Sequence, residues 1–88
     1  LRPSIIVELS VFPNPVTDSL RIKAELEVAS PLNIRLYDSL GRLVLEAEST
    51  SADRYFEHTL PMADLTSGMY YLELTDGQQS VSRPVIKG

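Results

Sequence analysis

Apolar and polar residues alternate along most of this chain, which is the period-two pattern of a strand with one buried face. In residues 20–26 every second residue is apolar and a charged residue stands at each position between. Residues 32–37 repeat the pattern and predict that Tyr37 points outward. Further strands are predicted at Ile5, Val7, Leu9 and Val11 on one face, at residues 43–45, at Phe56, His58 and Leu60 up to Pro61, at Tyr70, Leu72 and Leu74, and at residues 81–86.

Turn-forming residues stand between the predicted strands. Asp38 and Gly41 occupy the first and fourth positions of a predicted β-turn, which these residue types favour. Asp76 followed by Gly77 is typical of a tight hairpin. No helix is predicted, beyond at most one helical turn in residues 62–67. About seven short strands therefore predict an all-β fold, an immunoglobulin-like antiparallel β-sandwich.

A pair of prolines flanks Asn14 directly after the first predicted strand. Pro13 and Pro15 each lack an N–H group and fix φ, and a residue that precedes proline is disfavoured in the helical region. We expect residues 13–15 to form a stiff, extended corner that ends the first strand, because prolines do not pair in the middle of a sheet.

A second structural motif is formed by Leu65, Gly68 and Tyr70. Their spacing is that of a tyrosine corner, in which the phenol bonds back to upstream backbone and fixes a crossover between sheets. Gly68 is expected at positive φ, which a tight turn requires.

Length and composition narrow the functional classes. The 88 residues suffice for a single small domain, and 43% hydrophobic with 23% charged residues is ordinary for a globular protein. The chain has no cysteine, so disulfides and thiolate metal sites are excluded. A net charge of −4 with scattered basic residues argues against nucleic-acid binding. No apolar run approaches the roughly 20 residues of a membrane span. The length predicts one domain over residues 1–88. Because the chain begins at Leu1 and not at a methionine, we expect this domain to be cut from a larger protein.

Candidate catalytic and ligand-binding residues are few. His58 is the single histidine and lies in phase with apolar neighbours, so it is interpreted as part of a sheet face or rim. Three aspartates stand where turns favour aspartate, outside any calcium-binding loop of the D-x-D-x-D-G type. We expect no enzymatic activity, no metal and no cofactor. The residues considered for calcium are Asp38, Asp64 and Asp76, and those considered for a carbohydrate platform are Tyr37, Tyr55 and Tyr71.

The motifs taken as a set resemble a known family. A Phe-Pro-Asn-Pro corner is followed by LNIRLYDSLGRLV, then by ADLTSGMYYLEL, and then by a short basic and apolar end. This order and spacing, from about residue 11 to residue 87, resembles the C-terminal sorting domain of the type nine, or Por, secretion system of Gram-negative bacteria. The residues that carry the resemblance, with those of the terminal strand, are Pro13, Asn14, Pro15, Asp38, Gly41, Arg42, Leu65, Gly68, Tyr70, Arg83, Val85, Ile86 and Lys87.

The resemblance implies a function that residue chemistry alone does not indicate. Such domains end secreted cargo proteins, fold in the periplasm and are recognised by the outer-membrane translocon. At the cell surface a sortase-like peptidase commonly removes the domain and joins the cargo to anionic lipopolysaccharide. A minority of members keep the domain as part of the attachment machinery. The implied location is the periplasm in transit, then the outer-membrane surface or the exterior.

The last strand departs from the family pattern, because Arg83-Pro84 interrupts it before residues 85–87. Pro84 removes a ladder donor, so this strand is expected at a sheet edge or interrupted there. We expect residues 85–88 to form an exposed edge with few core contacts that a translocon reads by strand addition. The alternative functions are a retained module of an attachment-machinery subunit, a spacer or carbohydrate-binding domain of a secreted protein, and a small enzyme.

Overall fold

A computed structural model describes residues 6–50 and 54–88 of the chain. Within these ranges the regular structure consists of strands, and no helix is present. The strands are β1 (Ile6–Phe12), β2 (Ser19–Leu26), β3 (Pro31–Asp38), β4 (Leu43–Thr50), β5 (Tyr55–Pro61), β6 (Gly68–Thr75) and β7 (Ser80–Lys87).

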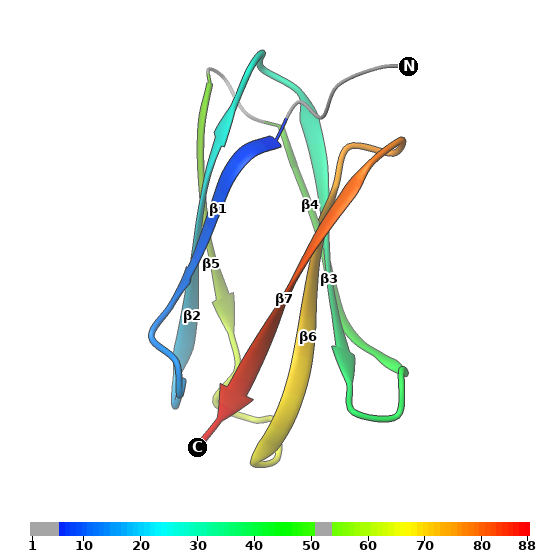
Figure 1. Cartoon of the computed structure of the whole chain (residues 1–88). Coiled ribbons are helices and arrows are strands. Elements are labelled where there is room, and N and C mark those ends of the chain that lie inside the picture. The colour runs from blue at the N-terminus through cyan, green and yellow to red at the C-terminus, as the bar shows by residue number, and fades with distance from the viewer. Residues whose placement is uncertain (1–5, 51–53) are drawn as a thin grey trace.

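The strands form two facing antiparallel sheets. One sheet has the order β1-β2-β5 and the other has the order β4-β3-β6-β7. Figure 1 shows the two layers side by side, with β1 and β7 running along the same side of the sandwich. The prediction of an all-β, immunoglobulin-like sandwich of about seven strands is confirmed.

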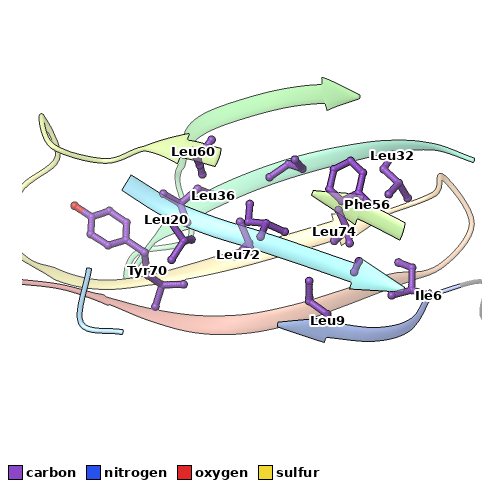
Figure 2. Packing of buried hydrophobic residues seen from close by; sticks show 14 of the residues in the cluster. Ile6, Leu9, Leu20, Leu32, Leu36, Phe56, Leu60, Tyr70, Leu72 and Leu74 are labelled. Atoms are coloured by element: carbon purple, nitrogen blue, oxygen red, sulfur yellow. The ribbon is translucent and has the colours of Figure 1, made fainter. Parts of the chain in front are cut away.

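The core lies between the two sheets and is built from the inward residues of the alternating strands. In β2 the residues Leu20, Ile22 and Leu26 are completely buried, while the charged residues between them face solvent. The same alternation buries Leu72 and Leu74 in β6. Figure 2 shows Leu20 from one sheet and Leu72 and Leu74 from the other meeting in one cluster of buried side chains. The sequence pattern therefore sets which face of each strand is apolar, and the two apolar faces cover each other.

Strand β1 departs from simple alternation. The predicted face contained Val7, but the Val7 side chain is 54% exposed, whereas Ile6 and Leu9 are buried. The pairing of β1 with β2 shifts register between Ile6 and Glu8, which is a bulge that adds one residue to β1. The prediction for Val7 is wrong, because the bulge turns the Val7 side chain to the solvent side of the sheet. Ile5, which was assigned to the same face, lies outside the described residues.

Strand β7 is an edge strand, as Pro84 predicts. It pairs with β6 on one side only, and Pro84 stands opposite Tyr71 in that pairing. An edge strand tolerates proline because one of its two sides needs no donors.

Four segments that carry the sequence motifs lie at the same end of the sandwich. These are the β1–β2 connection, the β3–β4 hairpin, the start of β6 and the end of β7, all at the bottom of Figure 1. The fold therefore gathers motif residues as far apart in the sequence as Asn14 and Ile86, which are separated by 72 positions.

Candidate recognition site at one end of the sandwich

The Pro-Asn-Pro corner reverses the chain between β1 and β2. These strands are antiparallel neighbours, so the segment that joins them must turn back on itself. The backbone bends at Asn14 and Pro15, and the peptide bonds before both prolines are cis. The corner ends β1 as predicted. The expectation of an extended segment is wrong, because an extended segment could not reverse the chain so that β2 runs antiparallel beside β1.

The corner also holds the end of β7. The Asn14 side chain accepts a hydrogen bond from the Ile86 N–H at 2.9 Å and donates one to the Pro84 carbonyl at 3.4 Å. The Val16 N–H donates to the Ile86 carbonyl and the Gly88 N–H donates to the Val16 carbonyl, both at 2.8 Å. Val16 and Lys87 thus form a short parallel bridge. We call residues 14–16 together with residues 84–88 the terminal clasp.

The terminal clasp covers the edge that was expected to be free. Val85 is completely buried and Lys87 is only 8% exposed. The Lys87 ammonium donates to the Gly88 carbonyl at 3.0 Å. The expectation of an exposed terminal edge with few core contacts is wrong for Val85 and Lys87, whereas the Ile86 side chain remains exposed. Its physical reason is that Val85 faces inward between the sheets, while residues 14–16 cross from the other sheet and satisfy the backbone groups of the strand end.

The β3–β4 hairpin is organised by Asp38. One carboxylate oxygen accepts hydrogen bonds from the N–H groups of Leu40 and Arg42, at 2.9 and 3.0 Å, and the other accepts from the Arg42 guanidinium at 2.8 Å. The hydrogen bond from the Arg42 backbone N–H has the largest effect in lowering the pKa of Asp38, and the hydrogen bond from the Arg42 side chain adds a smaller lowering. Gly41 has a φ of 82°, which suits glycine in this turn. The predicted turn is confirmed, and Asp38 serves its geometry.

The tyrosine corner is formed as predicted. The Tyr70 phenol donates to the Thr66 carbonyl at 2.6 Å, and Gly68 has a φ of 151°. Leu65 packs against the core, and its N–H donates to the Met62 carbonyl. Figure 2 shows the Tyr70 ring at the margin of the cluster. The corner closes the connection that passes from β5 in one sheet to β6 in the other.

Sheet register joins these separate motifs into one continuous site. Asp38 stands opposite Tyr70, and Tyr70 stands opposite Val85. In the next inward row, Gly68 stands opposite Lys87. Arg83 lies further along β7, where its guanidinium donates to the Ser82 carbonyl. The structure therefore brings together every predicted motif residue except Arg83 at or beside one end of the sandwich.

Val16 is the member of this site that sequence reasoning did not select. It is completely buried and supplies both backbone hydrogen bonds to the end of β7. A signal for it exists, because Val16 is the single apolar residue between the proline corner and the start of β2.

The residues considered as ligand-binding candidates do not form a shared site. Some lie on different sheets, and others accept the hydrogen bonds of a turn. Tyr37 and Tyr71 stand opposite each other, but Tyr55 lies on the other sheet. Asp76 accepts hydrogen bonds from the N–H groups of Gln78 and Gln79, as expected of a turn residue. His58 is half-buried and stacks on Phe56 at a centroid distance of 6.3 Å. Residues 6–50 and 54–88 contain no group of metal-ligating side chains that could hold an ion, and no helix in these ranges is long and apolar enough to cross a membrane.

The fold and the joined motifs define an immunoglobulin-like sandwich whose terminal strand is fastened by a proline corner. A family model described as the secretion system C-terminal sorting domain (Por_Secre_tail) matches residues 10–88. The chain therefore belongs to this family. The family comprises the C-terminal sorting signals of the type nine secretion system, and this role implies contact with the secretion machinery and transit to the outer membrane or cell surface.

A solved structure has the same fold. The chain is similar to part of the dimeric latent form of PorU from Porphyromonas gingivalis, with a TM-score of 0.75 and 16% sequence identity. The match covers 99% of this chain and 10% of the PorU chain. No curated protein sequence matches this one significantly.

Proposed function

We propose that the type nine machinery reads this domain in its folded form, and that the end of the sandwich holding the terminal clasp is the part it reads. In this proposal the domain folds in the periplasm and then meets the outer-membrane translocon. The observation that carries the proposal is the convergence of the family motifs. Asp38, Tyr70 and Val85 form one inward row, and Asn14 fastens the last strand beside them. These residues are far apart in the sequence and meet at one end of the sandwich only after folding. Because Tyr70 and Val85 are buried, they fix the shape of that end, and the machinery contacts the surface around them.

After translocation, a sortase-like peptidase removes the domain and joins the parent protein to anionic lipopolysaccharide. The domain itself performs no catalysis. Two features support this view: the one histidine is half-buried and stacks on Phe56, and the Asp38 carboxylate is occupied by the hydrogen bonds of its turn.

A secretion assay tests the sorting function. Residues 1–88 are fused to the C-terminus of a periplasmic reporter in a bacterium that has the type nine machinery. We expect the reporter at the cell surface, where added protease digests it. The same fusion in a strain that lacks the translocon is the control and should stay in the periplasm. A folded fusion that stays in the periplasm of the competent strain would contradict the proposal.

The mass of the surface reporter tests the second step. Removal of the domain predicts a reporter that has lost the 88-residue segment and migrates as a ladder of lipopolysaccharide-linked species. An intact, uniform fusion at the surface would contradict removal and favour a retained domain.

A further inference from the structure

The outer face of the four-stranded sheet carries contiguous apolar side chains beside the terminal clasp. Four of them remain well exposed, with values of 49% for Leu43, 40% for Met69, 47% for Tyr71 and 44% for Ile86. Scattered exposed apolar residues are normal, but a contiguous group on one face marks an interaction site. We call this group the apolar outer patch, and its members are Tyr37, Leu43, Met69, Tyr71, Pro84 and Ile86.

Sheet register shows that the members are neighbours. Tyr37 stands opposite Leu43 on one side and opposite Tyr71 on the other. Tyr71 in turn stands opposite Pro84, and in the adjacent outward row Met69 stands opposite Ile86. Residues opposite each other on one face of a sheet have Cβ atoms about 5 Å apart, so the patch extends across all four strands.

An acidic border lies along one side of the patch. Arg35 in β3 pairs with Glu46 at 2.9 Å and approaches Glu73 at 3.6 Å. Glu48 follows in the next row of the same face, opposite Asn33. Three carboxylates against one guanidinium leave this border with a net charge of −2. A partner that covers the patch gains from basic side chains at this border.

We propose that the apolar outer patch docks a protein of the secretion machinery whose contact surface is apolar at its centre and basic where it meets Glu46 and Glu48. This inference rests on the sorting function proposed above and names the surface on which recognition occurs. The aliphatic members Leu43 and Ile86 suit a protein surface, because they bury readily against other apolar side chains.

A second copy of this chain fits the face less well. In a symmetric pair stacked on this face, the acidic border meets either itself or the hairpin end. Like charges repel in the first arrangement. In the second, Arg42 is already paired with Asp38 at 2.8 Å and offers no surplus positive charge.

Paired substitutions on the two outer faces test the patch. Threonine keeps strand propensity while removing apolar surface, so Tyr71→Thr with Ile86→Thr should leave the fold intact. In the reporter fusion we expect this variant to lower surface delivery by about tenfold or more. The matched control is Val7→Thr with Tyr55→Thr, because these side chains are 54% and 69% exposed but belong to the other sheet. The control should deliver the reporter like the original chain.

The outcomes separate this inference from the sorting function. If the original fusion reaches the surface and the patch variant does so equally, the patch is wrong and the sorting function stands. If the original fusion fails, the sorting function itself fails. Should the melting temperature show that the first variant is unfolded, Leu43→Thr with Met69→Thr replaces it, and equal delivery by that folded variant overturns the patch.

The acidic border has its own test. Glu46→Gln with Glu48→Gln should lower delivery about threefold, since the charge contribution of a border is smaller than that of buried apolar contacts. Glu8→Gln with Glu57→Gln removes two carboxylates from the other sheet and is the control, with Glu57 likewise paired to a cation, Lys23. Equal delivery by the two variants would overturn the basic character assigned to the partner.

Two measurements on the 88-residue chain exclude other occupants. We expect a monomer in sedimentation experiments. A dimer that disappears with Tyr71→Thr would assign the patch to a second copy and overturn the proposal. We also expect no saturable change of tyrosine fluorescence when the anionic polysaccharide of lipopolysaccharide is added. A saturable change that Tyr71→Thr abolishes would assign the patch to a glycan.

Discussion

Asp38 shows how a single side chain can set the shape of a hairpin. Its two oxygens receive three hydrogen bonds from a segment only four residues long. Each of these bonds favours the charged carboxylate, which is why the pKa of Asp38 lies below its ordinary value. The Asp-x-x-Gly-Arg sequence is thus a structural unit, and Arg42 takes part in it through its backbone as well as its guanidinium.

Asp38→Asn should make the pH dependence of stability measurably different. Because the pKa is lowered in the folded protein, the charged form stabilises the fold fully above the unfolded pKa of about 4, and this contribution disappears as the pH falls through the folded pKa. We therefore expect the variant to be less stable than the original chain at neutral pH and the gap to narrow in acid. Urea denaturation of both proteins at neutral pH and in acid measures the difference in their free energies of unfolding.

Ser39→Ala in the same turn is the control for Asp38→Asn, because it keeps the carboxylate. It should retain the pH dependence of the original chain. A stability gap for Asp38→Asn that is equally large in acid would show that charge plays no part in the hairpin.

At the scale of the element, β7 is held from two sides by different means. On one side it pairs with β6 along its whole length. On the other side only its end is held, by the Asn14 side chain and by Val16. The uncovered part of this edge therefore stops at Pro84, where the contacts with residues 14–16 begin. The terminal clasp thus protects the last residues of a strand that would otherwise present free backbone groups.

Asn14→Ala should loosen the terminal clasp without disturbing the corner. The variant removes the acceptor of the Ile86 N–H, a hydrogen bond whose net contribution is about 0.5–1.5 kcal/mol. We expect a loss of stability in this range and faster amide exchange of Ile86. Chemical denaturation and hydrogen exchange measure the two effects. Thr17→Ala, an exposed neighbour, should change neither, and unaltered exchange at Ile86 in Asn14→Ala would contradict the clasp.

At the scale of the whole molecule, the end of the chain completes the sandwich. Val85 faces the core between the sheets, and Gly88 bonds to Val16 from the opposite layer. The last residues therefore close one end of the core and tie the two sheets together. Any surface that the secretion machinery reads here depends on the integrity of the fold.

Deletion of residues 85–88 should destabilise the domain strongly. Burial of the Val85 side chain alone is expected to contribute about 1.5–3 kcal/mol, and the clasp is lost with it. We expect a large drop in melting temperature, measured by circular dichroism. Ile86→Thr is the control, because Ile86 is 44% exposed on the outer face and its replacement should leave the melting temperature nearly unchanged. A truncated chain that melts like the original would contradict this role.

Local sequence patterns determined much of the fold. Alternation in residues 20–26 and 32–37 assigned inward and outward sides correctly, because the pleat of a strand forces a period of two. Asp38 with Gly41, and Gly68 with Tyr70, were also predictable, since each turn uses residues that lie within a few positions of one another. The edge position of β7 followed from Pro84, because proline lacks a donor.

Only the tertiary structure decided how these pieces meet. The register shift that turns Val7 outward depends on pairing with β2, which the sequence of β1 does not encode by itself. The contact of Asn14 with Ile86 joins positions 72 residues apart, and no local period reports such a distance. The burial of Val85 and Lys87 follows from that contact and from the closing of the two sheets. Sequence pattern specifies which face of a strand is apolar, whereas the packing of the sheets decides what that face touches.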